Sequence, residues 1–216
     1  MLKQNLIGSD EQILADVRQV YPHVDAVLGW TKRHIQTIKR QIAPYQGAVL
    51  AYFANHYNQY RCRFLEIGTA IGYSSCLMAT AAPLATITTL NPKDGEFEKA
   101  AENLRIRSNV NVLKMNSQSF FKVLEKAGML YDIIFVDGDH SYNMVLHDCQ
   151  FFNYLKPGGM ILFHDYSPDG SARPSNGSFL ALNKLQKRNR EADVKIIGTG
   201  LVGMLGWMRQ EGEVWL

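Results

Sequence analysis

An apolar run that ends in an acidic residue and passes into a glycine-rich turn occupies residues 64–74, FLEIGTAIGYS. Glycine reaches positive φ angles and carries no Cβ, so Gly68 and Gly72 permit a sharp turn and a close approach of a ligand to the main chain. A strand, a glycine turn and a helix in this order form the ligand crevice of open parallel sheets. The spacing E-x-G-x-x-x-G differs from the G-x-G-x-x-G dinucleotide fingerprint, which disfavours a nicotinamide cofactor.

From residue 63 onward, strand-like and helix-like segments alternate. We expect strands at 64–67, 86–90, 111–114, 133–136 and 160–163, and helices at 74–81, 97–106, 119–127, 142–154 and 179–187. Apolar runs without polar alternation, such as 131–136, are typical of strands that are covered on both faces. Repeated βα units predict an α/β fold with a doubly wound, mostly parallel sheet of seven strands, and residues 194–208 predict a C-terminal antiparallel hairpin at its edge.

The first 60 residues have a different character: they are mostly helical in pattern, with breaks at Pro22 and Pro44. We expect an N-terminal helical extension or lid over 1–60 and the main ligand-binding domain over 61–216, together forming one compact unit. The helical extension and the apolar hairpin are candidate surfaces for a homodimer.

Composition excludes several classes of protein. The formal net charge is +3, and no long Lys/Arg block is present, so we expect no nucleic-acid partner. The three cysteines are far apart in the sequence and odd in number, which fits a reducing cytosol better than a disulfide framework. No signal-peptide core or membrane-spanning apolar run is visible, so we expect a cytoplasmic protein without a membrane partner.

Polar residues follow the ends of five predicted strands, where ligands bind in an open α/β sheet. They are Glu66 with the 68–72 loop; Asn91; Asn116, Ser117 and Gln118; Asp137, Asp139 and His140; and His164, Asp165 and Tyr166. Because the carboxyl ends of parallel strands meet at one edge, these side chains predict a ligand site there.

Two further segments, VDGDHSY at 136–142 and LKPGGMILFHDY at 155–166, carry a specific resemblance. With the glycine turn, they resemble the class I S-adenosylmethionine (SAM)-dependent methyltransferases, and among these the small-molecule O-methyltransferases. The resemblance spans about residues 46–208 and implies a Rossmann-like fold, SAM as cofactor and a small hydroxylated acceptor. It also implies a cofactor pocket lined by Glu66, Gly68, Thr69, Gly72, Ser74, Asn91, Ser117, Gln118 and Asp137.

The same resemblance implies catalytic roles. Catechol and caffeoyl-CoA O-methyltransferases hold a divalent metal with aspartates that Asp137 and Asp165 match, although Tyr166 stands where an asparagine is usual. Macrolide-sugar O-methyltransferases are similar in their Asp-Gly-Ser-His loop, on which His140 matches the general base. On that pattern Asp137, His164 and Asp165 would hold Mg²⁺ or another divalent cation, and His140, Asp137 and Asp165 are the catalytic residues.

The sequence also departs from the family pattern. The second strand usually ends in an acid that binds the ribose hydroxyls, whereas Asn91 or Thr89 stands there, depending on the alignment. An asparagine carbonyl accepts one hydrogen bond but lacks the charge of a carboxylate. The frequent adenine-binding aspartate is replaced by residues 115–118, MNSQ, which resemble the Ala-Ser-Gln adenine contact of the catechol enzymes.

Several alternatives stay open from the sequence alone. Asp139 and His140 could serve only to cap the helix that follows them, and His164 could be a hydrogen-bonded core residue. The chain could also be a metal-independent N-methyltransferase, or a non-catalytic protein that retains the methyltransferase fold. The acceptor cannot be read from the sequence; residues 167–178 have the composition of a turn-rich flap over it.

Overall fold

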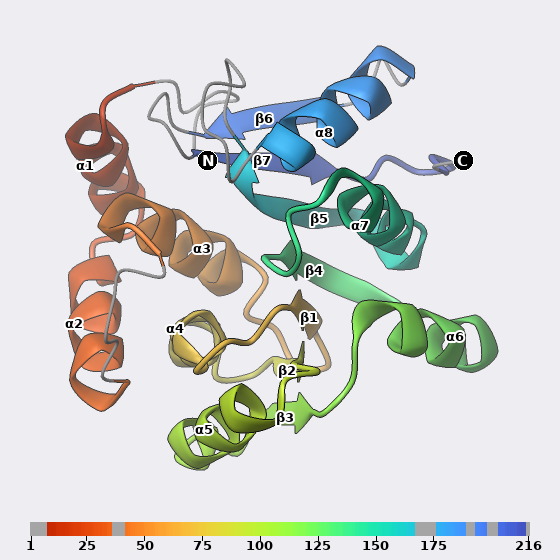
Figure 1. Cartoon of the computed structure of the whole chain (residues 1–216). Coiled ribbons are helices and arrows are strands. Elements are labelled where there is room, and N and C mark those ends of the chain that lie inside the picture. Colours follow the sequence, from red (N-terminus) through yellow and green to blue (C-terminus); the bar gives the residue numbers. More distant parts are fainter. Residues whose placement is uncertain (1–7, 36–41, 167–175, 189–192, 198–202, 215–216) are drawn as a thin grey trace.

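A computed structural model of the chain describes residues 8–35, 42–166, 176–188, 193–197 and 203–214 (Figure 1). The strands are β1 (Arg63–Ile67), β2 (Thr86–Leu90), β3 (Val110–Leu113), β4 (Tyr131–Val136), β5 (Leu155–Tyr166), β6 (Asp193–Ile197) and β7 (Gly203–Met208). The helices are α1 (Asp10–Val20), α2 (Val24–His34), α3 (Pro44–His56), α4 (Tyr73–Ala81), α5 (Asp94–Leu104), α6 (Ser117–Ala127), α7 (Tyr142–Asp148), the 3₁₀ helix η1 (Cys149–Tyr154) and α8 (Asn176–Arg188).

The strands form one seven-stranded sheet in the order β3-β2-β1-β4-β5-β7-β6. The first five strands pair in parallel, while β7 runs antiparallel to both β5 and β6. The predicted α/β sheet and its C-terminal antiparallel pair are therefore confirmed. The strand order reverses between β1 and β4, and ligands of such sheets bind at this point of reversal.

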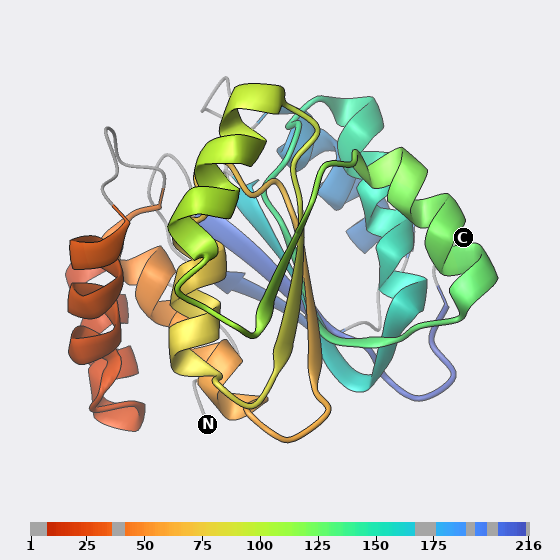
Figure 2. The same cartoon turned by 90° about the horizontal axis from the view of Figure 1, so that it is seen from below.

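Successive residues of each strand face opposite sides of the sheet, as the strand period of two requires. Phe64 packs with α1, α3 and α4 in one core, and Leu65 packs with α6, α7 and α8 in the other. Figures 1 and 2 show these helices as layers on the two faces of the sheet. Two predicted segments differ: β5 is longer than 160–163, and the helix expected over 142–154 changes to 3₁₀ geometry after Asp148.

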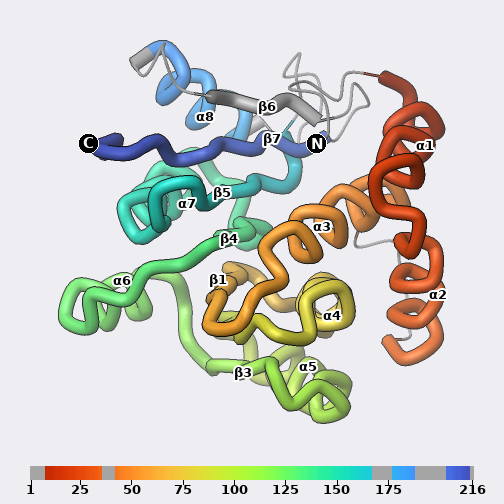
Figure 3. Tube along the Cα trace, turned by 180° about the vertical axis from the view of Figure 1, so that it is seen from behind, coloured from red at the N-terminus to blue at the C-terminus, as the bar shows by residue number. Residues whose placement is uncertain are grey.

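The N-terminal helices are continuous with the main core. α3 is buried along almost its whole length and packs in the same core as Ile133 and Phe135 of β4. α1 and α2 lie outside it, against α3 and α4, as the view from behind shows (Figure 3). Residues 44–56 therefore belong to the domain that the sequence pattern begins at residue 61.

Two expectations fall partly outside the described residues. These are the flap at 167–178, of which 167–175 is not described, and the link between the hairpin strands at 198–202. No helix within the described ranges is both long and apolar enough to cross a membrane.

Candidate functional site

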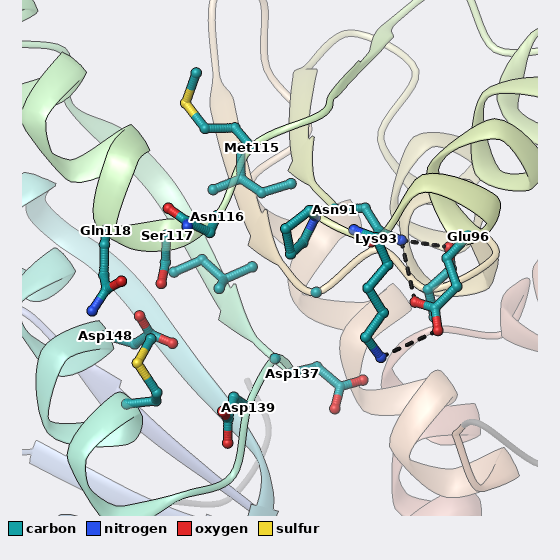
Figure 4. Close-up of a pocket in the computed structure, with 17 residues that line it drawn as sticks. Asn91, Lys93, Glu96, Met115, Asn116, Ser117, Gln118, Asp137, Asp139 and Asp148 are labelled. Carbon is teal, nitrogen blue, oxygen red and sulfur yellow. Dashed lines mark hydrogen bonds and ion pairs between the residues drawn. The ribbon is translucent and has the colours of Figure 1, made fainter.

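A pocket of about 550 Å³ opens at the carboxyl ends of the strands, next to the reversal between β1 and β4 (Figure 4). This volume suits a small-molecule ligand. Of the residues predicted to bind a cofactor, the pocket is lined by Gly68, Asn91, Ser117, Gln118 and Asp137. It is also lined by three acids that the sequence reasoning did not assign to a cofactor, namely Glu96, Asp139 and Asp148.

Four other predicted cofactor residues, Glu66, Thr69, Gly72 and Ser74, are not among the lining residues. Glu66 is fully buried beneath the glycine loop, where its Oε2 accepts hydrogen bonds from the hydroxyls of Ser75 and Thr89. Burial raises the pKa of Glu66 to about 7. The hydroxyl oxygens of Thr69 and Thr89 lie 2.5 Å apart in the same buried network.

Glu66, Thr69 and Ser74 therefore support the loop from below, which differs from the direct pocket contact predicted from the sequence. Thr89 belongs to the same network and is also absent from the pocket lining, so the structure selects Asn91 from the two alignments of the second strand.

The two motif glycines are required by protein packing. Gly68 has φ +101°, and a Cβ added there would lie 2.1 Å from the carbonyl oxygen of Asp137. Gly72 has φ +92°, and an added Cβ would lie 2.8 Å from the side chain of Leu104. Gly72 also stands at the N-cap of α4. The glycine pattern predicts close approach of a cofactor, whereas in the structure Asp137 and Leu104 fill the space beside these glycines.

Asn91 lines the pocket, but both ends of its amide bind the backbone. Its Nδ2 donates to the carbonyl of Ala70 at 3.0 Å, and its Oδ1 accepts from the N–H of Lys93 at 3.0 Å. Glu96, in the first turn of α5, lies beside it with Oε2 3.4 Å from Asn91 Nδ2. A carboxylate therefore lies beside the end of β2, from a residue five positions after Asn91.

Four residues, two from the loop after β4 and two from the end of β5, form a charged cluster beside the pocket. His164 Nδ1 lies 3.0 Å from an oxygen of Asp137 and 3.0 Å from an oxygen of Asp165. The second oxygen of Asp165 is 2.9 Å from His140 Nε2. Asp165 has φ +54°, an uncommon angle for a residue other than glycine, and such backbone strain is frequent at functional sites.

In the structure Asp139 and His140 have different roles, although the sequence allowed both of them to cap the following helix. Asp139 Oδ1 accepts a hydrogen bond from the N–H of Ser141 at 2.8 Å, so Asp139 stabilises the turn into α7. The ring of His140 instead contacts Asp165. His164 is buried and lies within hydrogen-bond distance of Gln46, as a hydrogen-bonded core histidine would, but its other ring nitrogen faces the carboxylates of Asp137 and Asp165.

Gln46 of α3 determines which nitrogen of His164 carries a proton. The amide oxygen of Gln46 accepts from the backbone N–H of Ala43 at 2.8 Å, which fixes its orientation, and it lies 3.1 Å from His164 Nε2. His164 Nε2 must therefore donate. The other nitrogen, Nδ1, faces two carboxylates without meeting hydrogen-bond geometry to any described residue.

This arrangement calls for a positive charge between the carboxylates. Burial alone would lower the pKa of His164, but Asp137 and Asp165 outweigh it and raise that pKa to about 10. Burial would likewise raise the pKa of Asp165, whereas His140 and His164 hold it well below its usual range. A proton on His164 can supply this charge, and so can a bound cation.

The geometry also fits a divalent metal ion. One ligand atom from each of Asp137, His164 and Asp165 lies within 4.8 Å of the others. In an octahedral shell with bonds of about 2.1 Å, neighbouring ligand atoms lie about 3.0 Å apart. The two contacts of His164 Nδ1 have this spacing. The donor set of two carboxylates and one imidazole suits a transition ion such as Mn²⁺ better than Mg²⁺.

Residues 65–166 match a family described as a methyltransferase domain. This segment is a class I, SAM-dependent methyltransferase domain. It runs from the middle of β1 to the end of β5 and holds every residue of the charged cluster.

Solved structures of similar fold support this identification. The chain superposes on a putative O-methyltransferase from Klebsiella pneumoniae with a TM-score of 0.63 and 25% identity, covering 89% of this chain and 94% of that one. It superposes on an O-methyltransferase from Bacillus cereus, solved with S-adenosylhomocysteine (SAH), with a TM-score of 0.64 and 19% identity, covering 89% and 95%. The second likeness, at this identity, concerns the fold.

A curated relative is 30% identical over 127 residues: an uncharacterised protein of Acanthamoeba polyphaga mimivirus. The match covers 55% of this chain and 58% of the viral protein, so the chain spans little more than half of that relative.

Proposed function

We propose that the protein transfers the methyl group of SAM to a hydroxyl group of a small metabolite. The observation that carries this proposal is that Asp137 lines the ligand pocket and also belongs to the charged cluster with His164 and Asp165. A cofactor in the pocket and an acceptor at the charged cluster would therefore lie on opposite sides of Asp137. This is the placement that direct transfer between two substrates requires.

The pocket offers contacts for the ribose and the adenine of SAM. When bound, SAM supplies a methyl group that is already activated on a sulfonium. We expect the carboxylate of Glu96, which lines the pocket, to accept hydrogen bonds from the ribose hydroxyls, while Asn91 binds the backbone of the loop after β1. Ser117 and Gln118 line the opposite side, where Figure 4 shows them away from Lys93 and Glu96.

His140 is the proposed general base. Asp165 holds its Nε2 at 2.9 Å, which orients the ring. Burial opposes a charge on the ring, but Asp165 and Asp137 outweigh it and raise the pKa of His140. The described residues provide no hydrogen-bond partner for Nδ1. This nitrogen would take the proton of the acceptor hydroxyl while the hydroxyl oxygen forms its bond to the methyl carbon and the bond from that carbon to the sulfur of SAM breaks, with SAH as the leaving group.

Asp137, His164 and Asp165 are the proposed metal ligands, with Gln46 fixing the ring of His164 behind them. Such second contacts orient metal-binding imidazoles in many proteins. When bound, a divalent ion would act as a Lewis acid that lowers the pKa of the acceptor hydroxyl. Mn²⁺ is the ion that the imidazole donor favours.

The test begins with the cofactor. Calorimetric titration of the purified chain with SAH should give one site per chain, and absence of heat and of a thermal shift at millimolar SAH would refute the proposal. Transfer of radiolabelled methyl from SAM is then measured on a panel of catechols, phenols, sugars and amines, with Mn²⁺ and with chelator. Labelling of hydroxylated acceptors supports the proposal, whereas labelling of amines alone, unaffected by chelator, would assign nitrogen as the acceptor atom.

A further inference from the structure

Asp148, the last residue of α7, is an acid buried in the wall of the pocket. Its side chain is 1% exposed, and its Oδ1 has no hydrogen-bond partner among the described residues. The hydroxyl of Ser117 lies close to the carboxyl group and favours its ionised form. A buried polar atom without a partner is costly, so a native structure that retains one usually has a use for it.

The residues around Asp148 indicate which ligand group would hydrogen-bond its Oδ1. Ser117 and Gln118 lie next to it in Figure 4, and the pocket lining also includes the apolar side chains of Met115 and Met144. Apolar side chains suit the faces of a flat aromatic ring, and a carboxyl oxygen suits a donor on its edge. Glu96 and Lys93 occupy the opposite side of the pocket, which leaves this side for the purine of the cofactor.

From this placement we propose that Asp148 Oδ1 accepts a hydrogen bond from the exocyclic amino group of adenine, and so makes the pocket select adenine over a 6-oxo purine. The inference rests on the proposed function, because it assumes that the pocket binds SAM. Asp148 would replace, from α7, the aspartate that the sequence lacks after β3.

The raised pKa of Asp148 is consistent with a carboxyl group that lacks a hydrogen-bond partner. Burial raises the pKa of Asp148 to about 7, and the nearby charge of Asp139 acts in the same direction. An amino group of the ligand would stabilise the ionised carboxylate. A merely structural acid would instead be expected to have both oxygens satisfied by the protein.

Binding of two ligands that differ only at this edge tests the proposal. SAH carries a 6-amino group, and S-inosylhomocysteine carries an oxygen there. At pH 8 the wild-type chain should bind SAH at least about tenfold more tightly, since two acceptor oxygens would otherwise face each other. In Asp148→Asn the amide can donate to the 6-oxo group, so the preference should fall to less than about threefold or reverse.

Glu125→Gln is the control, because Glu125 is an exposed acid that is not among the residues that line the pocket. It should keep the wild-type preference. Equal wild-type affinity for both ligands, or an unchanged preference in Asp148→Asn, would overturn the inference while leaving SAH binding intact. Failure of the wild-type chain to bind SAH at all would instead overturn the proposed function and the inference with it.

Discussion

A side chain on Gly68 would overlap the backbone of Asp137, because the ideal Cβ position lies 2.1 Å from the Asp137 carbonyl oxygen. The N–H of Asp137 also donates to the carbonyl of Ile67 at 2.8 Å. The turn after β1 and the turn after β4 are therefore packed backbone to backbone. This contact places Asp137 at the edge of the pocket and beside His164.

Gly68→Ala should consequently damage both stability and cofactor binding. The substitution adds a clash and a Cβ at φ +101°, which together should cost at least about 2 kcal/mol. For a chain of this size that corresponds to a fall in Tm of roughly 5 °C or more. Gly95→Ala is the control, since its Cβ would meet no atom within 4 Å, and it should be neutral or slightly stabilising. A Gly68→Ala variant with the wild-type Tm would contradict the packing argument.

The buried Glu66 should make stability depend on pH. Its folded pKa is about 7 and its ordinary value is 4.5, so between these values the folded chain holds a proton that the unfolded chain has lost. Stability conferred by this group is present below about pH 4.5 and is lost as the pH rises to 7, by an amount on the order of 3 kcal/mol.

Glu66→Gln removes this titration. Relative to wild type, its free energy of unfolding in urea should therefore rise as the pH increases from 5 to 7 and then level off. The exposed Glu98→Gln should follow the wild-type curve. A constant difference between Glu66→Gln and wild type across this range would show that Glu66 has no raised pKa.

The sequence predicts the sheet because its signals are local and strong. Successive strand residues such as Ile133 and Ile134 point to opposite faces of the sheet and are both apolar. The alternation of strands with helices along the chain then leaves few possible topologies. The positions of Asp137, Asp165 and His140 follow from the rule that strand ends meet at one edge. Their mutual contacts, however, depend on loop geometry such as the positive φ of Asp165, which no residue pattern specifies.

Glu96 and Asp148 were missed because they project from helices. A side chain on a helix reaches the pocket only if the helix has the right rotation, which is fixed by tertiary packing. The sequence pattern does carry a signal for Asp148. It lies three residues after Val145 and directly before Cys149, both of which are buried, so it belongs to the buried face of its helix. An acid on an apolar face is unfavourable without a partner. Gln46 could not be found this way, since it meets His164 across 118 residues.

The ribose contact should depend on Glu96 and only indirectly on Asn91. Glu96→Gln should weaken SAH binding about three- to thirtyfold, because a neutral amide accepts hydrogen bonds less strongly than a carboxylate. Asn91→Asp should also weaken binding, since it loses the bond to Ala70 and places a second charge beside Glu96. Calorimetry with SAH measures both. Tighter binding by Asn91→Asp would show that residue 91 itself contacts the ribose.

Metal binding should follow the donor set of the cluster. Mn²⁺ should bind one site, measured by electron paramagnetic resonance, and more tightly than Mg²⁺ because imidazole is one ligand. Asp165→Asn and His164→Ala should abolish the site, and His164→Asp should bring the two affinities closer together. If Mn²⁺ binds neither wild type nor His164→Asp, a protonated His164 is the cation between the carboxylates.

His140→Ala should reduce methyl transfer by about 10²- to 10⁴-fold, the usual contribution of a positioned general base. SAH affinity should change by less than about twofold, because the ring faces Asp165 and the acceptor side. Added imidazole should restore part of the rate in this variant and leave the wild-type rate unchanged. Asp139→Ala tests whether loop disorder alone accounts for the loss, since Asp139 holds the backbone of the same turn, and it should retain most of the activity. Full activity in His140→Ala, on the acceptor that the panel identifies, would mean that another group removes the proton.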